Sequence, residues 1–314
     1  MAAGGEGAGA REQGEPVPTT PIRVAQAGGT PEEILARAAG ENFPVAARVL
    51  PRRLRDDLMA LYGFARLVDW AGDEAPGDRL ALLDALERDL ARIFAGQRPE
   101  HPLLVRLATT VQRRGLAEEP LRRLIEANRR DQRVLRYATF AELRDYCALS
   151  ADPVGQLVLQ VFGVASPARE SLSDRVCTAL QLAEHWQDVA EDLRAGRIYL
   201  PLEDRERFGC DERALAAAHA GPELRALLAF EVARARRLLE SGAPLVNSLR
   251  GFARIAVAGF VAGGHAALDA IARCDYDVLP GPPRPRRRDL LRHLLRLLWT
   301  SRGRGRVAPG RSAS

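Results

Sequence analysis

The sequence predicts an all-α protein, in which helices pack into a bundle around a central cavity. Apolar residues recur at helical spacing over most of the chain from about residue 30 to residue 300. Residues typical of helix caps and helix stops stand at the ends of these periodic segments. No segment shows convincing alternation of apolar and polar residues between turn signals, so a β-sheet is not expected.

Composition is typical of a globular protein and excludes one class of partner. The chain has 314 residues, of which 46% are hydrophobic and 28% charged, enough for one large domain or two ordinary ones. The net charge of +5 comes with no lysine, and the arginines concentrate at the C-terminus. Nucleic-acid binding requires a basic face with interleaved aromatic residues, whereas only 5% of this chain is aromatic. We therefore expect no nucleic-acid partner.

Cysteines and apolar runs indicate the compartment. Cys147, Cys177, Cys210 and Cys274 lie far apart, which favours reduced, mostly buried thiols over a zinc site or a disulfide framework. No signal peptide is recognisable, and no run reaches the ~18 apolar residues that span a bilayer. Glycines interrupt the most apolar region, 255–268, so we interpret it as a buried core helix. These features predict a cytoplasmic protein.

The predicted elements follow in order. Residues 1–28 are rich in Gly, Ala, Pro and Gln without periodicity, and we expect them to be disordered. Thr30 and Pro31 then begin the helical domain, which we assign to residues 29–279. Beyond it, 280–314 comprises a basic, proline-rich linker, an amphipathic helix at 289–300 and a disordered tail. The further segments that we expect to be helical are 78–95, 101–114, 121–135, a helix opened by Thr139, 153–162, 171–195, 211–220, 223–239 and 245–273.

One acidic line lies on the helix predicted at 171–195. Gln181, Glu184, Asp188 and Asp192 share one side of this helix at about 100° per residue, opposite an apolar side that includes Trp186. Gly196 supplies the helix stop. Taken alone, such a line is most often a solvated polar face.

A second acidic pair changes this interpretation. The apolar stripe that begins at Leu54 continues through Tyr62 onto Asp69 and then Asp73, with Arg66 beside it. Ionised carboxylates near a core are costly unless they are paired or bind metal. Two helices that each carry Asp-x-x-x-Asp predict four carboxylates facing one another across a cavity. Mg²⁺ prefers such oxygen ligands and shares its coordination shell with substrate phosphates.

These motifs together resemble the squalene/phytoene synthase family over roughly residues 35–300. The resemblance rests on Tyr62-x-x-x-Arg66-x-x-Asp69-x-x-x-Asp73, Tyr146-Cys147, Asp188-x-x-x-Asp192 and 196–201 (GRIYLP). Within the family the chain is most similar to the hopanoid-pathway branch, hydroxysqualene synthase (HpnC). That similarity rests on 41–46 (ENFPVA), 136–140 (RYATF), 153–155 (PVG) and 185–188 (HWQD).

The resemblance implies an isoprenoid-synthase fold and a set of site residues. Presqualene diphosphate would be the substrate, Mg²⁺ the cofactor, and water the trap for a carbocation. The implied metal ligands are Asp69, Asp73, Asp188 and Asp192, and we add Glu184 as a fifth. Tyr146 and Tyr62 are the catalytic candidates. The candidates for substrate binding are Arg66, Arg197, Tyr199, Phe43, Gln187 and Phe162.

Four positions depart from the family pattern. Glu184 replaces the usual asparagine, and it either ligates metal or disturbs the site by repulsion. Trp70 stands where the hopanoid branch repeats aspartate, and Asp152 replaces its usual asparagine before Pro153. Gln187 replaces the arginine of the condensing enzymes, which fits the hopanoid branch better.

Several functions remain open at this point. The leading prediction is Mg²⁺-dependent conversion of presqualene diphosphate to hydroxysqualene. The alternatives are a head-to-head synthase that makes presqualene or phytoene diphosphate, and a catalytically weakened homologue that binds isoprenoid. Sister enzymes of the hopanoid and squalene pathway are the expected protein partners. The helix at 289–300 either caps the bundle or lies on anionic lipid, which would make the protein peripheral to the inner face of the membrane.

Overall fold

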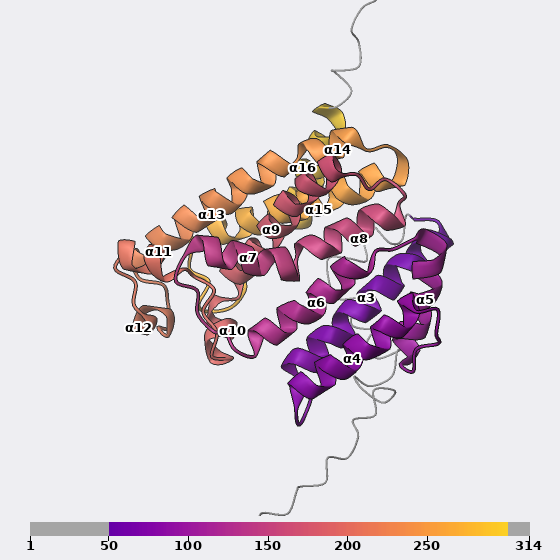
Figure 1. Cartoon of the computed structure of the whole chain (residues 1–314). Coiled ribbons are helices and arrows are strands. Elements are labelled where there is room, and N and C mark those ends of the chain that lie inside the picture. Colours follow the sequence, from indigo (N-terminus) through magenta and orange to yellow (C-terminus); the bar gives the residue numbers. More distant parts are fainter. Residues whose placement is uncertain (1–49, 301–314) are drawn as a thin grey trace, which may run out of the picture.

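The computed structural model describes residues 50–300, which form helices and connecting loops with no β-strand in that range. The expected disorder of 1–28 and of the tail, the helix start at Thr30, the 41–46 stretch and Phe43 lie outside the described residues. All-α architecture is thereby confirmed (Figure 1). The helices are α3 (Arg52–Asp73), α4 (Arg79–Phe94), α5 (Pro102–Arg114), α6 (Glu118–Asp131), α7 (Phe140–Ser150), α8 (Asp152–Val161), α9 (Pro167–Gln187), α10 (Val189–Arg194), α11 (Leu202–Arg207), α12 (Glu212–Leu215), α13 (Pro222–Gly242), α14 (Pro244–Ser248), α15 (Gly251–Arg273) and α16 (Arg287–Thr300).

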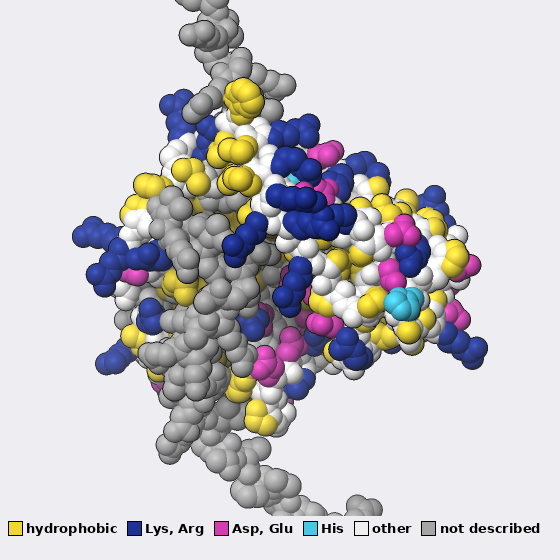
Figure 2. Space-filling model, turned by 180° about the vertical axis from the view of Figure 1, so that it is seen from behind, with side chains coloured by type: hydrophobic (Ala, Val, Ile, Leu, Met, Phe, Trp, Pro, Cys, Tyr) yellow, Lys and Arg dark blue, Asp and Glu magenta, His cyan; other side chains and the backbone are white. Residues whose placement is uncertain are grey.

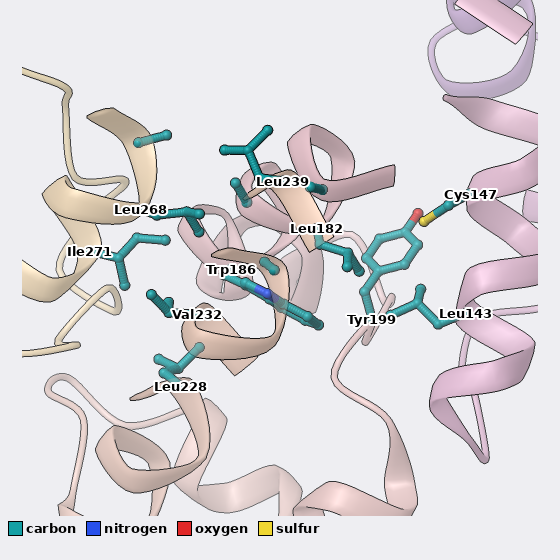
Figure 3. Close-up of a cluster of buried hydrophobic side chains, with 14 of the residues drawn as sticks. Leu143, Cys147, Leu182, Trp186, Tyr199, Leu228, Val232, Leu239, Leu268 and Ile271 are labelled. Carbon is teal, nitrogen blue, oxygen red and sulfur yellow. The ribbon is translucent and has the colours of Figure 1, made fainter. Parts of the chain in front are cut away.

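The helices pack around two hydrophobic clusters that meet at α8. Helices α3 to α6 surround one cluster, with Phe64 and Leu67 fully buried in it. Helices α7, α9, α13 and α15 surround the other, in which Trp186 lies among side chains such as Leu182, Leu228 and Val232 (Figure 3). Helix α9 packs against α8, α13 and α15, so it runs through the middle of the bundle (Figure 1). Much of α9 is buried in this position, whereas a few of its side chains, Glu184 among them, are exposed.

Most predicted helix ends are confirmed because local side chains determine them. The Asp78 carboxylate accepts from the Ala81 N–H at 3.0 Å and begins α4. At α7 the Thr139 hydroxyl accepts from the Glu142 N–H, and Glu142 accepts from the Ala138 N–H in return. Gly196 has φ +80° after α10, a left-handed conformation that suits glycine.

Three predicted helices differ from the structure. The single helix expected at 171–195 divides at Asp188, whose φ of −102° and ψ of 16° separate α9 from α10. The expected helix at 245–273 divides into α14 and α15 at Leu249, which is extended. The expected helix at 211–220 shortens to the single turn of α12. Apolar periodicity continued through each break, so sequence alone could not locate them.

Helix α15 is long and apolar enough to cross a membrane by length and composition, and it is the one such helix within residues 50–300. Much of it is buried between α9, α13, α14 and α16. Its fully buried side chains include Ala258, Val261 and Leu268. The prediction of a core helix over 255–268 is confirmed.

Two extended segments, one around residues 135–137 and the other around 198–202, lie side by side next to the helices that carry the acidic motifs. The Ile198 N–H donates to the Leu135 carbonyl at 2.9 Å, and the Leu202 N–H donates to the Tyr137 carbonyl at 2.9 Å. One isolated parallel bridge joins Arg136 to Ile198. The stretches 136–140 and 196–201, which carry part of the family resemblance, are therefore neighbours in space.

Candidate functional site

The first acidic motif lies on the last two turns of α3. Arg66 stands 3.6 Å from the Asp69 carboxylate, one turn away. The Asp69 and Asp73 side chains are 45% and 44% exposed, so they lie beside the buried stripe and not on its continuation. The sequence argument that burial makes these two carboxylates costly is wrong, because Phe64, Leu67, Val68 and Ala71 occupy the core-facing side.

Trp70, at the position where the branch usually has a second aspartate, packs against the N-terminal hydrophobic cluster and is partly buried. Its side chain therefore adds apolar contact next to Asp69 and provides no ligand oxygen.

The second motif carries the expected electrostatic cost. Burial raises the pKa of Asp188 to about 6, and the nearby Glu191 carboxylate adds to the effect. Burial also raises the pKa of Asp192 to about 7, with further contributions from Asp188, Glu184 and Glu191. Four carboxylates thus gather at the junction of α9 and α10, and Glu191 is a member that the sequence analysis missed. A cation at this point would relieve the repulsion.

Arg197 connects the two motifs. Its guanidinium lies 2.6 Å from the Asp73 carboxylate, across 124 residues of sequence, and its charge also lowers the pKa of Asp192. The backbone sets this position, because the Arg197 N–H donates to the Asp192 carbonyl at 2.8 Å after the turn at Gly196. Asp73, Asp192 and Arg197, which the sequence analysis selected separately, meet in one place.

A cluster of rings forms the inner wall beside Arg197. Tyr199 stacks on His185 with ring centroids 3.7 Å apart, and Tyr146 lies 5.7 Å from Tyr199. Figure 3 shows Tyr199 beside Leu143 and Cys147 of α7. Tyr137 completes the cluster at 5.5 Å from Tyr146. Aromatic walls of this kind suit a carbocation, since ring faces attract positive charge.

Asp131 is the functional candidate that the sequence analysis missed most clearly. Its carboxylate accepts a hydrogen bond from the Tyr146 hydroxyl at 2.7 Å, while its second oxygen is buried with no hydrogen-bond partner among the described residues. Burial raises the pKa of Asp131 to about 6. A signal was available, because Asp131 follows Leu124 and Ala127 on the buried face of α6.

His185 also belongs to the site, although only its place in the 185–188 stretch drew attention to it. Burial lowers its pKa to about 3, so the ring is neutral at pH 7. One ring nitrogen lies 3.3 Å from the Gln181 amide, and the other lies 4.0 Å from the Asp192 carboxylate. The histidine therefore links the acidic end of α9 to the aromatic wall.

An apolar cavity of about 150 Å³ lies further along α9. Helices α8, α9, α14 and α15 supply its lining, which consists of Val154, Gly155, Val158, Leu159, Ser173, Val176, Cys177, Leu180, Leu245, Val257 and Phe260. Leu180 and Asp188 are eight residues apart, which corresponds to about 12 Å along a helix. Dry cavities of about 150 Å³ admit a benzene-sized group, so this one accommodates part of an isoprenoid chain.

Gly155 allows α8 and α9 to approach at this cavity. A Cβ atom at this position would lie 2.3 Å from the Ser173 hydroxyl and 2.5 Å from the Cys177 sulfur. Both contacts are far inside van der Waals distance, so a larger residue would displace the Ser173 and Cys177 side chains.

Three predicted site residues lie elsewhere or in the core. The Gln187 amide donates to the Pro283 carbonyl at 2.5 Å, so this side chain holds the proline-rich linker. Phe162 ends α8 and packs against both hydrophobic clusters instead of lining the cavity. Tyr62 is buried on α3. Gln187 and Phe162 thus have protein partners that their sequence positions did not reveal.

The donor chemistry suits Mg²⁺, although no three His, Cys, Asp or Glu side chains within residues 50–300 converge closely enough to hold a metal as they stand. All candidate ligands, Asp69, Asp73, Glu184, Asp188 and Asp192, supply carboxylate oxygens. Burial chiefly raises the pKa values of Asp188 and Asp192, and neighbouring carboxylates add to the effect, which Arg197 opposes at Asp192. The Mg²⁺ site stays a prediction.

Asp152, another departure from the family pattern, is buried at the start of α8. The Thr178 hydroxyl donates to its carboxylate at 2.8 Å and ties α8 to α9. Burial raises the pKa of Asp152 to about 7, while this hydrogen bond acts in the opposite direction. An asparagine could accept the same hydrogen bond without charge.

We expect Asp152→Asn to stabilise the fold increasingly as pH rises. The pKa is about 7 in the folded chain against 3.8 unfolded, so wild-type stability is full below pH 4 and falls as pH rises through 7. One pKa unit corresponds to about 1.4 kcal/mol, and we expect the variant to gain at least about 1 kcal/mol at pH 8. Thermal unfolding at pH 5 and pH 8 measures this, with exposed Asp145→Asn as control. An equal gain at both pH values would contradict it.

A sequence model of the squalene/phytoene synthase family matches residues 36–292. The chain belongs to the squalene/phytoene synthase family. A hydroxysqualene synthase of Sinorhizobium fredii is 35% identical over 216 residues, 68% of this chain and 72% of that protein. A 15-cis-phytoene synthase of Synechococcus elongatus is 34% identical over 262 residues, 78% of this chain and 84% of that protein.

Solved structures agree with the family assignment. The crystal structure of squalene synthase HpnC from Alicyclobacillus acidocaldarius shares 44% identity and a TM-score of 0.73, covering 79% of this chain and 92% of that one. A dehydrosqualene synthase with bound ligand has a TM-score of 0.78 at 24% identity, which supports the fold. The isoprenoid-synthase fold is confirmed, and squalene/phytoene synthases are enzymes that process isoprenoid diphosphates.

Proposed function

We propose that this squalene/phytoene synthase homologue converts presqualene diphosphate to hydroxysqualene in a Mg²⁺-dependent reaction. The observation that carries the proposal is the arrangement along α9. The apolar cavity lies beside Leu180, and the carboxylates near Arg197 begin at Asp188, about 12 Å further along the helix. Such a site accepts an apolar chain and a diphosphate on one molecule. The similarity to hydroxysqualene synthases and to HpnC supports the choice of reaction.

In the proposed reaction the carbon–oxygen bond to diphosphate breaks, and the diphosphate leaves with the bonding electrons. A carbon–carbon bond of the substrate's cyclopropane ring then breaks as the cation rearranges, and water adds to the cationic carbon and loses a proton, which gives the linear alcohol. Mg²⁺ held by Asp69, Asp73, Asp188 and Asp192 would offset the charge of the departing diphosphate. Arg197, now paired with Asp73, lies where it can bind diphosphate oxygens, and Arg66 on α3 is a second candidate.

The aromatic wall would receive the carbocation. Tyr199 stacks on His185 next to the acidic end, and Tyr146 lies 5.7 Å from Tyr199. Burial raises the pKa of Tyr146 well above its usual value, so the hydroxyl stays protonated and its hydrogen bond to Asp131 keeps it oriented. Asp131, with a pKa raised to about 6 and a second buried oxygen, is suited to accept a proton from an incoming water.

A head-to-head prenyl synthase is the second candidate. It is favoured by the phytoene synthase of Synechococcus elongatus, whose similarity extends over a larger share of this chain than that of the hydroxysqualene synthase from Sinorhizobium fredii. A catalytically weakened isoprenoid-binding homologue is a third, because Glu184 and Trp70 depart from the family pattern. Sister enzymes of the same pathway would be the protein partners of either enzyme.

Product analysis distinguishes these functions. Purified full-length protein is incubated with Mg²⁺ and, separately, with labelled presqualene diphosphate, farnesyl diphosphate or geranylgeranyl diphosphate. Hydroxysqualene from presqualene diphosphate alone supports the proposal. Presqualene diphosphate from farnesyl diphosphate, or phytoene diphosphate from geranylgeranyl diphosphate, would establish the condensing function instead. Binding without any product would identify the weakened homologue.

Glu184→Asn tests the assignment of Glu184 as a metal ligand. Glu184 lies one turn before Asp188 and is close enough to raise the pKa of Asp192. As a ligand it would strengthen Mg²⁺ binding, so we expect half-saturation by Mg²⁺ to rise about tenfold in the variant. Titration of activity with Mg²⁺ measures this, with Glu191→Gln as the matched control. A lower or unchanged half-saturation would count against the ligand role: increased turnover would then indicate that Glu184 disturbs the site, and no change at all would indicate an exposed glutamate without a role.

A further inference from the structure

Helix α16 is held on the bundle by its inner face. The Arg273 guanidinium bonds to the Asp289 carboxylate at 2.7 Å, and His293 lies 2.8 Å from the Asp269 carboxylate. At the other end, Arg254 donates to the Leu298 carbonyl at 2.9 Å. Leu294, Leu297 and Leu298 pack against the larger hydrophobic cluster. These contacts fix the rotation of α16, so its outer face is defined.

The outer face carries a line of large apolar side chains. Leu291, Leu295 and Trp299 succeed one another at four-residue spacing, and they are 54%, 57% and 77% exposed. Phe252 and Ile255, at 42% and 40%, flank Arg254 on the neighbouring end of α15. These five residues, which we call the apolar ridge, are five of the eight exposed large hydrophobics among the described residues. Single exposed apolar residues are ordinary, whereas three in line along one helix, with two more on the helix packed beside it, indicate an interaction surface.

Arginines border the apolar ridge. Arg287, Arg288, Arg292 and Arg296 are exposed on α16, and the linker adds exposed Arg284 and Arg286 just before it. The one acidic residue of α16, Asp289, is buried against Arg273. Figure 2 shows hydrophobic side chains at the top of the molecule, where Figure 1 places α16, with basic side chains on either side. Arg292 pairs with Asp269 and Asp289, so the positive charge beside the apolar ridge comes chiefly from Arg284, Arg286, Arg287 and Arg288.

We propose that the apolar ridge and its arginines dock on the surface of an anionic lipid bilayer. A tryptophan and leucines on one face of a helix, bordered by arginine, are the composition of helices that lie in the membrane interface. The leucines and Trp299 would enter the acyl boundary, while the long arginine side chains reach lipid phosphates. A protein partner would require an acidic counterpart of matched shape, whereas a fluid anionic surface needs only charge and apolar depth.

Docking would also bring the apolar cavity close to lipid. Helix α15 carries Phe252 and Ile255 of the ridge, and about one turn later Val257 and Phe260 line the cavity. A lipid-soluble molecule could then pass between bilayer and cavity over a short path. The proposal itself concerns the surface and does not depend on which reaction the site performs.

Vesicle flotation with the full-length protein tests the proposal. We expect binding to phosphatidylcholine vesicles containing about 30% phosphatidylglycerol, at least about tenfold weaker binding to pure phosphatidylcholine, and loss of binding at high salt. Leu291→Ser/Leu295→Ser and, separately, Arg287→Gln/Arg288→Gln should each lower the bound fraction about tenfold. Leu202→Ser, an exposed leucine on α11, is the matched control and should bind normally.

Tryptophan fluorescence gives a second readout. Trp299 is exposed, whereas Trp186 is fully buried and Trp70 is partly buried. A blue shift on addition of anionic vesicles that disappears in Trp299→Phe would locate the contact at the ridge. Circular dichroism checks that each variant remains folded, as expected for outer-face substitutions.

Three outcomes would overturn the proposal. The first is equal binding of wild type and the ridge variants, and the second is absence of wild-type binding to anionic vesicles. The third is concentration-dependent self-association, seen by sedimentation and lost in Leu291→Ser/Leu295→Ser, without vesicle binding. That result would assign the ridge to an interface between two copies of the chain.

Discussion

Alanine at Asp69 or Asp188 is expected to lower turnover by about 10²–10³ each, because groups that stabilise developing charge in a closed site have effects of this size. Asp69 lies on α3 beside Arg66, and Asp188 lies at the break between α9 and α10. The two therefore test opposite walls of the site. Loss of Asp188 also relieves repulsion with Asp192, so the fold should remain intact or gain stability.

The measurement is turnover of presqualene diphosphate at saturating Mg²⁺, together with circular dichroism. Asp56→Ala is the matched control on α3, since Asp56 is exposed and lies 4.0 Å from Arg52. Glu191→Ala is the control on α10, where it removes a neighbouring carboxylate that is not among the predicted ligands. Near-normal activity of both Asp69→Ala and Asp188→Ala would disprove the metal assignment.

Arg197→Gln is expected to have the second large effect, again a loss of about 10²–10³ in turnover. The substitution removes the charge that joins Asp73 to Asp192 and that we propose to bind diphosphate. Arg197→Lys keeps the positive charge but lacks the planar guanidinium that can donate two parallel hydrogen bonds. Its activity should therefore lie between those of wild type and Arg197→Gln. Inorganic diphosphate should also inhibit Arg197→Gln more weakly than wild type.

Arg194→Gln provides the control for Arg197. Arg194 is an exposed arginine on α10, three residues away, and its loss removes the same charge from the same region. If Arg194→Gln and Arg197→Gln lost activity equally, the effect would come from overall charge and not from the contact with Asp73. Unchanged activity in Arg197→Gln would remove this residue from the site.

The sequence alone correctly predicted the helical class and most helix ends. These depend on contacts within a few residues, such as Thr139 with Glu142 or the left-handed turn at Gly196. It also selected Asp73, Asp192, Arg197, Tyr146 and Tyr199, which lie together in the structure. Helical spacing places residues of one helix on one face. The family motifs then indicated which helices face one another across the site.

Burial could not be predicted as well as spacing. Periodicity assigned Asp69 and Asp73 to the buried stripe, yet both side chains are nearly half exposed. The same reasoning overlooked Asp131, which is buried and bonded to Tyr146. Whether an acid beside an apolar stripe is buried depends on the helix that packs over it, and the stripe itself does not reveal that helix.

Tertiary structure alone determined the contacts between distant segments. The pairing of Leu135 with Ile198 brings Tyr137 next to Tyr199, and Gln187 binds Pro283 across 96 residues. Packing also determined which face of α16 contacts the bundle and which face is exposed. The sequence could not assign these faces, because it left open whether the helix caps the bundle or contacts lipid. The local sequence determines where each helix begins and ends and which side chains share a face, because these properties depend on interactions between residues a few positions apart. Which other segments each helix contacts depends on close packing of the whole chain, and only the folded structure determines these contacts.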